Sequence, residues 1–428
     1  MGARGVQLGV QDALWLDMDR PTNLMVADVV VWTATPLDLD RLRAAIAERF
    51  VDRYPVFACR AVRDDDTWWE PDPDFDLDRH IETAALSDPD DPAELQSLMS
   101  ARRVRALDRR HPLWQVILVE RYREGSAMIF RSHHAVADGM RMVQLAMSLF
   151  DAAPEGGAIL GPPSAQHGAQ PRPARRSLRE LLMAAPGFAD AVRKLVFGPR
   201  NRRSLWTGAA GTDKGIAWSD PLPLAEVKRV AKANGCTVND VLTAAVAVTL
   251  NQYLRSQDAH CSSVTFMIPV NLKPLDLSMP ETLGNEFALT QLELPTDHPD
   301  ARAVLRTVKR RMDRIKKGNE AAIAFRLQAA IAGVSQGLYE ASVDLFTKRT
   351  LGVLTNVPGP PIPVYLAGAL VDTIIGWAPV SGDQPMSFSI CSYNGQVTVG
   401  VAADTGLVPE YGLIAEGFAG AFAQIAQV

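Results

Sequence analysis

The sequence has 428 residues, 47% of them hydrophobic and 22% charged, a composition typical of a globular protein with room for two domains. Its formal net charge of -5 gives no general attraction to phosphate backbones, which argues against a nucleic-acid partner. The four cysteines are far apart and lack metal-binding spacing, so we expect reduced thiols and no metal site in a cytoplasmic protein.

The N-terminal residues Met1 to Val6 lack the apolar core of a signal peptide, and Val6 stands where a myristoylation signal needs Ser or Thr. We therefore expect neither export nor a lipid anchor. No uninterrupted apolar stretch approaches the ~18 residues of a membrane-spanning helix. Contact with the inner membrane or a lipid-droplet surface is therefore expected to be peripheral.

Hydrophobic periodicity predicts both helices and strands in the first part of the chain. Two strands flank the turn Arg123-Glu124-Gly125, so they should form a hairpin. Residues 61–91 are acidic and punctuated by proline, which predicts irregular strands and loops. The expected helices cover residues 8–16, 39–53 and 92–107, and the expected strands cover residues 25–32, 115–120 and 127–132.

Residues His133 to Gly139 read His-His-Ala-Val-Ala-Asp-Gly and follow the second strand of that hairpin. Adjacent histidines at a strand end point to opposite sides, so only one can face a given cleft, and we assign this role to His134. A neutral imidazole can accept a proton from a hydroxyl and return it within one catalytic cycle. Asp138 is expected to accept backbone N–H bonds at the next helix, and Gly139 to let the chain pass close to a neighbour. For an isolated histidine pair, the alternative is a structural role at the hairpin end.

From Ala152 to about Thr212 proline and glycine become frequent and the periodic pattern is interrupted, which predicts a connection between two domains. Within it, Arg172 to Arg203 combines basic and apolar groups. Such a segment can lie on an anionic membrane surface as a basic amphipathic helix. The alternative is a solvated linker.

A second set of helices and strands is predicted after this connection. Thr237 and Asp240 have the spacing of a capping box that opens a long apolar helix to about Leu254. A helix over 299–317 carries a basic face, which is either solvated or attracts the phosphates of coenzyme A. The other expected helices cover 224–233, 320–346 and 410–427, and the expected strands cover 216–218, 264–272, 287–294, 386–392 and 396–402. Residues 351–360 are expected to form a strand that runs into a Pro/Gly turn.

Five separated segments resemble, in order and spacing, those of the wax ester synthase/diacylglycerol acyltransferases. They are residues 8–16, 112–114 (Pro-Leu-Trp), 133–139 (HHxxxDG), 237–241 (with Asn239-Asp240) and 354–360 (LTNVPGP). The HHxxxDG run is typical of the superfamily that also includes chloramphenicol acetyltransferase and condensation domains. The resemblance implies an α/β (α+β) fold of two chloramphenicol acetyltransferase-like domains, with the active site in a tunnel at their interface. We place these domains at residues 1–151 and 216–428, with a linker at 152–215.

The resemblance also implies an O-acyltransferase that moves a long-chain acyl group from acyl-CoA to diacylglycerol or a long-chain alcohol, with no tightly bound cofactor. His134 would be the general base, supported by His133, Asp138 and Gly139. Its products would be triacylglycerol or wax ester.

The tetrahedral intermediate of this reaction carries an oxyanion that needs a hydrogen-bond donor, and Asn271 and Asn239 are the candidates by position. One alternative is a transferase of the same fold that uses another acceptor or a donor bound to a carrier protein. The other is a lipid-binding relative that has lost turnover. The intact histidine, Asp138 and Gly139 argue against the second alternative.

Overall fold

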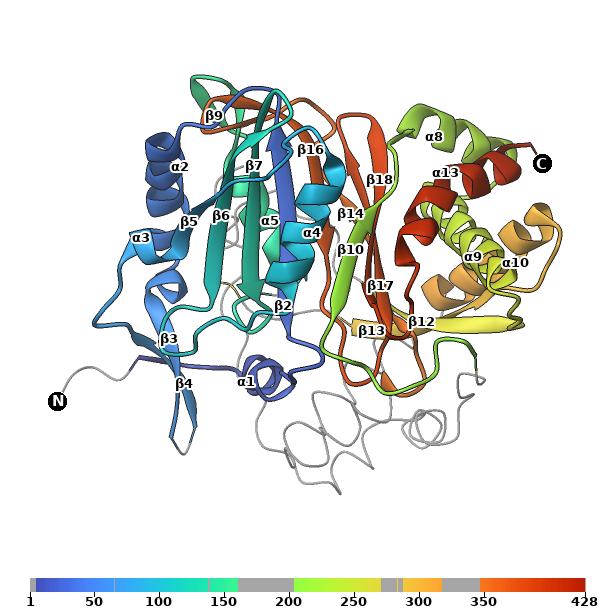
Figure 1. Ribbon diagram of the computed structural model, residues 1–428, viewed down its shortest axis with the longest axis horizontal. Coiled ribbons are helices and arrows are strands. Elements are labelled where there is room, and N and C mark those ends of the chain that lie inside the picture. Colours follow the sequence, from blue (N-terminus) through green and yellow to red (C-terminus); the bar gives the residue numbers. More distant parts are fainter. Residues whose placement is uncertain are drawn as a thin grey trace.

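Two mixed β-sheets, each accompanied by helices, form two lobes that lie side by side (Figure 1). Helices α8, α9, α10 and α13 gather on the outer side of the second lobe. The expected two-domain fold of mixed sheets and helices is thus confirmed. The computed structural model describes residues 5–64, 66–137, 139–160, 204–270, 283, 288–317 and 347–427.

An eight-stranded sheet forms the first lobe, with strand order β5-β6-β7-β2-β16-β15-β8-β9. Strands β6 and β7 are antiparallel and meet at the turn that contains Arg123, so the predicted hairpin is confirmed. The strands of this sheet, in the order given, are Ile81–Ala84, Trp114–Tyr122, Gly125–His133, Val26–Thr33, Ala369–Trp377, Tyr365–Leu366, Phe150–Ala153 and Gly156–Ala158.

Strand β16 comes from the second half of the sequence but pairs with β2 of the first lobe, with Trp377 opposite Asp28. No strand was predicted here from the sequence. Buried positions alternate with more exposed ones along this strand, but the more exposed ones include the apolar Leu370 and Ile374, so the sequence shows no clean apolar–polar alternation. This strand ties the two halves of the chain together within one sheet.

Most helices of the first lobe lie where they were predicted, but α3 (Leu77–His80) falls within residues 61–91, which were expected to form irregular strands and loops. The helix expected over 39–53 begins at Leu39 and continues from Ala47 as a single π-helical turn before Tyr54. The helix expected over 92–107 ends at Arg103. The helices are α1 (Val10–Asp17), α2 (Leu39–Ile46), α3 (Leu77–His80), α4 (Pro92–Arg103) and α5 (Gly139–Ser148), and the small sheet beside them contains β1 (Val6–Gln7), β3 (Cys59–Arg63) and β4 (Thr67–Pro71).

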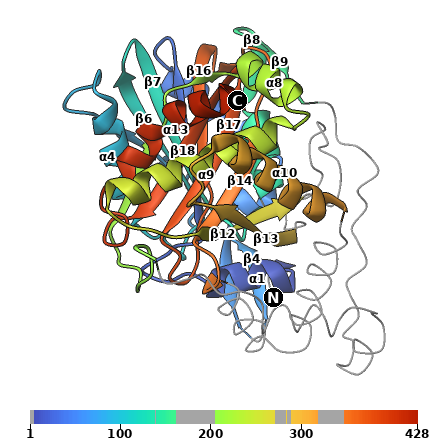
Figure 2. The ribbon, with the colours of Figure 1, turned by 90° about the vertical axis from the view of Figure 1, so that its right-hand side faces the viewer.

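A seven-stranded sheet forms the second lobe, with strand order β10-β18-β17-β14-β12-β13 and β11 paired to β18. Its strands, in that order, are Lys214–Trp218, Gln396–Asp404, Met386–Tyr393, Gly352–Pro358, Ser263–Val270, Ala288–Pro295 and, for β11, Leu222–Pro223. Its helices are α8 (Leu224–Ala233), α9 (Val238–Ser256), α10 (Ala301–Lys317) and α13 (Tyr411–Ala426). Figure 2 shows α10 beside α9, on the side of the lobe that faces away from β16.

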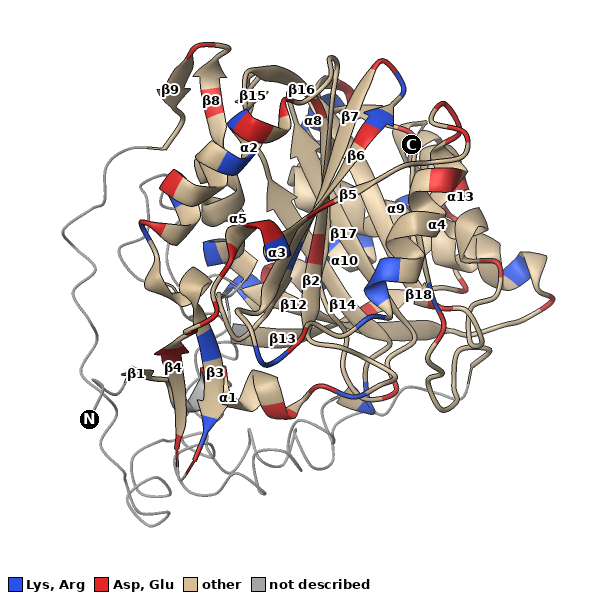
Figure 3. Cartoon of the chain, turned by 60° about the vertical axis from the view of Figure 1, so that its left-hand side comes forward, with Lys and Arg blue, Asp and Glu red and all other residues tan. Residues whose placement is uncertain are grey.

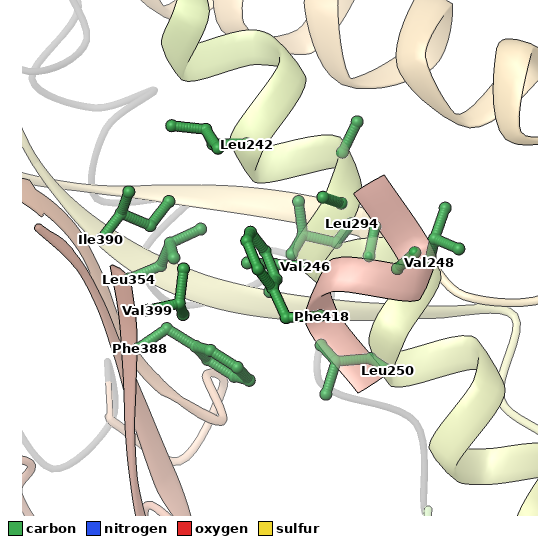
Figure 4. Close-up of a cluster of buried hydrophobic side chains, with 14 of the residues drawn as sticks. Leu242, Val246, Val248, Leu250, Leu294, Leu354, Phe388, Ile390, Val399 and Phe418 are labelled. Carbon is green, nitrogen blue, oxygen red and sulfur yellow. The ribbon is translucent and has the colours of Figure 1, made fainter. Parts of the chain in front are cut away.

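The core of the second lobe lies between its helices and its sheet. Leu242 and Val246 of α9 and Phe418 of α13 point toward Phe388 and Val399 of the sheet (Figure 4). All five side chains are almost completely buried. The predicted apolar character of the helix from Thr237 onward is explained by this burial from both sides.

A further core lies where the two lobes meet. It contains Val30 of β2, Met99 of α4, Ile216 of β10 and Cys391 of β17 in one cluster of buried residues. The N–H of Ile216 also donates to Ser100 Oγ of α4 at 2.9 Å. Burial raises the pKa of the Cys391 thiol to about 11, so this cysteine stays a neutral packing group.

Charged residues of both signs are interspersed over the outer elements, as Figure 3 shows for α2 and α3. Within the described part of the chain, no helix combines the length and apolar character that crossing a bilayer requires. The predicted helix over 320–346 and the basic segment Arg172 to Arg203 lie outside the described residues.

Candidate active site

The histidine pair lies at the end of β7, in a turn whose following residues are anchored in the core. Ala135, Val136 and Ala137 are all buried, and the N–H of Val136 donates to the carbonyl oxygen of His133 at 3.0 Å. Apolar residues at these three positions therefore fix the turn. Helix α5 begins immediately after it, as the sequence predicts.

The Pro-Leu-Trp segment supports this turn from the neighbouring strand. The N–H of His133 donates to the carbonyl oxygen of Leu113 at 3.0 Å. Trp114 Nε1 donates to the carbonyl oxygen of Phe57 at 2.9 Å, and the indole is buried. This tryptophan anchors the start of β6.

His133 is held by hydrogen bonds on both ring nitrogens. Its Nδ1 accepts from the N–H of Ala135 at 3.1 Å, so the ring proton lies on Nε2. Nε2 then donates to Asp19 Oδ2 at 3.2 Å. The imidazole is 1% exposed. His133 is thus a structural residue that ties the end of β7 to the loop before β2.

Asp19 links several segments around the histidine pair. Besides His133, it accepts from the N–H of Met25 at 2.6 Å and from Arg109 Nη2 at 3.0 Å. Burial tends to raise the pKa of Asp19, but the hydrogen bonds donated by His133, by the N–H of Met25 and by Arg109 together hold that pKa below its ordinary value of 3.8. The carboxylate is therefore charged throughout the neutral range.

Replacing Asp19 with asparagine is expected to lower the free energy of unfolding by about 1.5–3 kcal/mol at pH 7, since hydrogen bonds to a charged group are lost. The folded pKa is depressed, so this contribution is present above pH ~4 and disappears as the pH falls through the folded pKa. Urea unfolding of both proteins at pH 7 and pH 3.5 measures it. A stability difference that is larger at the lower pH would contradict the role given to the carboxylate.

His134 lies in a different environment from His133. Its N–H donates to the carbonyl oxygen of Met25 at 2.7 Å, which fixes the backbone beside β2. The residue is 8% exposed and its Nδ1 is buried. The ring stacks on Trp15 of α1, with 4.3 Å between ring centroids and 30° between planes. The buried Nδ1 and the stacked indole together fix the orientation of the imidazole.

Two other predicted site residues, Asp138 and Asn271, lie outside the described residues. Gly139 is exposed as the first residue of α5. A Cβ added there would meet no described atom within 4 Å, so close packing against the described chain does not explain this glycine.

Two of the family-like segments meet in the second lobe. Asn356 Nδ2 of β14 donates to Asn239 Oδ1 of α9 at 2.8 Å. Thr237 and Asp240 form the predicted capping box, with bonds of 2.9 and 3.2 Å, so that prediction is confirmed. Lys316 Nζ of α10 lies 3.7 Å from Asp240 Oδ1. The helix start that carries Asn239 is therefore held by both a strand and a second helix.

Trp15 and Asp19 were not among the residues predicted for this site. A tryptophan in a short helix and an acidic residue in a loop have no spacing that points to a distant histidine. The segment 8–16 was singled out only through its family resemblance. No group of three or more His, Cys, Asp or Glu side chains within the described ranges is arranged to hold a metal ion.

Comparison with known proteins identifies relatives along most of the chain. The model of the wax ester synthase/diacylglycerol acyltransferase catalytic domain matches residues 8–213, and that of the WS/DGAT C-terminal domain matches residues 283–426. A Mycobacterium tuberculosis protein named as a diacylglycerol O-acyltransferase is 26% identical over 441 residues, which cover 96% of this chain and 93% of that protein. Another so named from the same species is 26% identical over 370 residues, covering 80% and 79%.

Solved structures give the same fold. A wax ester synthase/diacylglycerol acyltransferase from Marinobacter aquaeolei VT8 has a TM-score of 0.74 at 21% identity, with 99% of this chain and 100% of that chain covered. The first condensation domain of the calcium-dependent antibiotic synthetase has a TM-score of 0.64 at 18% identity, with 99% and 97% covered. From the two family models and this shared fold, the chain belongs to the wax ester synthase/diacylglycerol acyltransferase family and is an acyltransferase.

Proposed function

We propose that the protein transfers a long-chain acyl group from acyl-CoA to the hydroxyl of diacylglycerol or of a long-chain alcohol, with His134 as general base. The observation that carries this proposal is the contrast between the two histidines. His133 is bonded at both ring nitrogens, whereas His134 has a buried Nδ1 and an orientation fixed by Trp15. His134 is therefore the residue that can present Nε2 to an acceptor hydroxyl.

The reaction then proceeds by direct transfer. Nε2 of His134 takes the hydroxyl proton while the alcohol oxygen forms a bond to the thioester carbonyl carbon. When the tetrahedral intermediate collapses, the carbon–sulfur bond breaks and the imidazolium returns its proton to the departing coenzyme A thiolate. The products are an ester and free coenzyme A, and no acyl-enzyme is formed.

The oxyanion of the intermediate needs a preorganised donor, and Asn271 and Asn239 remain the two proposed residues. For Asn239, support comes from its fixed amide, because Asn356 bonds the oxygen and so orients the NH2 group. Asp138 and Gly139 keep their proposed structural roles beside the catalytic turn.

The test of this function is release of free thiol from palmitoyl-CoA with dioleoylglycerol or hexadecanol, with the lipid products resolved by thin-layer chromatography. Thiol release that depends on one acceptor, with the matching ester as product, supports the proposal and names that acceptor. No release with either acceptor would contradict it. Transfer only from a carrier-protein thioester would point instead to the alternative of a carrier-bound donor, which the matched family models do not favour.

The basic face of α10 is proposed as the part of the surface that attracts the coenzyme A phosphates. Four exposed arginines follow each other at four-residue spacing, which places them on one side of the helix. Among the described residues, the ion pairs of α10 are made by other basic side chains, Lys309, Arg311 and Lys316. The four arginines are Arg302, Arg306, Arg310 and Arg314.

Reversing the charges of Arg310 and Arg314 to glutamate is expected to raise KM for palmitoyl-CoA by about tenfold, since the loss of a surface attraction and the gain of a repulsion are together worth ~0.7 kcal/mol at each position. These positions lie on the half of α10 that reaches Asp240 through Lys316. The matched control reverses Arg302 and Arg306, two turns away on the same helix, and should change KM less. If both double variants changed KM equally, or neither changed it, the basic face of α10 would be a solvated surface that does not bind coenzyme A.

We also propose that the protein lies in the cytoplasm and makes peripheral contact with a lipid surface. Both proposed acceptors are poorly soluble in water, so a transferase must meet them at such a surface. The segment Arg172 to Arg203 stays the proposed contact, on the basis of its basic and apolar sequence.

A further inference from the structure

Helix α1 lies below the end of β7 (Figure 1) and brings one aromatic ring to the catalytic turn. Trp15 stacks on His134 with 4.3 Å between ring centroids and a 30° angle between the planes. One face of the imidazole is therefore covered by an indole from a helix that is far from His134 in sequence. Trp15 itself is only partly buried.

The position of α1 is fixed independently of its contact with His134. Leu14 and Leu16 on either side of Trp15 are buried. Arg109 Nη2 donates to the carbonyl oxygen of Leu16 at 2.5 Å and also to Asp19 Oδ2. Asp19 Oδ2 in turn accepts a hydrogen bond from Nε2 of His133. The helix, the loop that follows it and the histidine pair are thus one hydrogen-bonded unit.

We propose that Trp15 is a positioning residue for His134, an inference that rests on the proposed function. The stacked indole restricts rotation of the imidazole, so that Nδ1 stays in the protein and Nε2 stays toward the substrate. It also keeps water from one face of the ring, and it provides a favourable π surface when the ring becomes an imidazolium during transfer. A base misplaced by about 1 Å can lose on the order of 10²-fold in rate.

If Trp15 only packed in the core, its substitutions would affect kcat differently. Trp15 and Trp69 both pack against the same hydrophobic cluster of the first lobe as partly buried side chains. Removal of either indole therefore removes contacts with that cluster. Only the stacking on His134 requires a flat aromatic ring at position 15, so phenylalanine should replace tryptophan there while leucine should not.

The experiment measures kcat and KM for palmitoyl-CoA and the preferred acceptor in Trp15→Leu, Trp15→Phe and Trp69→Leu. We expect Trp15→Leu to lower kcat by about 10–100-fold with KM changed less than about threefold, because the base is displaced and binding is retained. Trp15→Phe should recover most of kcat, and Trp69→Leu should keep it. Trp15→Met is the second variant if the leucine variant does not fold, since methionine fills the space without a planar face.

Three results would overturn the inference: Trp15→Leu with wild-type kcat, Trp15→Phe as impaired as Trp15→Leu, or Trp69→Leu as impaired as Trp15→Leu. Failure of the proposed function is recognised separately, because the wild-type protein would then release no thiol. In that event, carbethoxylation of His134 by diethylpyrocarbonate, followed by mass spectrometry, still tests the stacking. Faster modification in Trp15→Leu than in the wild type and in Trp69→Leu supports it, and equal rates oppose it.

Discussion

Replacing His134 with alanine is expected to lower kcat by about 10²–10⁴-fold, which is the usual contribution of a positioned general base. The chain should still fold, because the turn is fixed by the burial of Ala135, Val136 and Ala137 and not by the imidazole. The measurement is thiol release from palmitoyl-CoA at saturating acceptor, together with a thermal melt of the variant. Retained turnover in a folded variant would reject His134 as the base.

His80 offers a matched control for the loss of a buried imidazole. Its ring stacks on Trp114 with 4.5 Å between centroids, and its Nδ1 lies 2.9 Å from the carbonyl oxygen of Trp114. Burial lowers the pKa of His80, which favours the neutral ring there. His80→Ala should cost stability through the lost contacts and leave kcat per folded molecule near the wild-type value. An equal loss of kcat in both variants would show that the effect of His134→Ala is structural.

Local patterns were sufficient to predict much of the fold. The hairpin of β6 and β7 depends on a turn and two apolar runs that are neighbours in the sequence, and the capping box depends on residues three apart. Strand β16 was missed because its apolar residues do not alternate regularly with polar ones, and its partner β2, with Asp28 opposite Trp377, lies at the other end of the chain. Periodicity can reveal a strand, but it does not say to which lobe the strand belongs.

The candidate site could be proposed from the sequence because most of its candidate groups stand in one short run, His133 to Gly139. The assignment of His134 rested on alternation along a strand, and the bonds of His133 to Ala135 and Asp19 agree with the supporting role proposed for that residue. Trp15 and Asp19 reach the histidines only after the chain has folded. No local rule marks a loop carboxylate as the partner of a residue more than a hundred positions away.

A second substitution with a large expected effect is that of Asp28, which is buried on β2 between two arginines. Its Oδ2 accepts from Arg103 Nη1 at 2.5 Å and its Oδ1 accepts from Arg131 Nε at 3.1 Å. The arginines extend this cluster, since Arg131 also donates to the carbonyl oxygen of Arg105 and Arg103 to that of Ala378. One carboxylate thus joins α4, β7, β2 and the segment after β16, and it was not predicted from the sequence.

Replacing Asp28 with alanine is expected to lower the free energy of unfolding by about 3–5 kcal/mol, because two guanidinium groups would stay buried without their carboxylate. Arg131 is 1% exposed and Arg103 9%, so water cannot easily take the place of the lost acceptor. Total stabilities of proteins are on the order of 5–15 kcal/mol, so the variant should be folded but marginal. Urea unfolding at neutral pH measures the change.

Asp40→Ala is the control for this prediction, because Asp40 pairs with Arg43 at 3.3 Å while its own side chain is 92% exposed. An exposed pair of this kind contributes at most about 1 kcal/mol. If Asp28→Ala cost no more than Asp40→Ala, the buried arginines would have to be satisfied by other groups, and the carboxylate would not be what holds them. If the predicted loss is found, the charge cluster at Arg131 stabilises the same strand, β7, that positions His134 three residues further along the chain. Substitutions in this cluster would then affect both the stability of the fold and the placement of the proposed base.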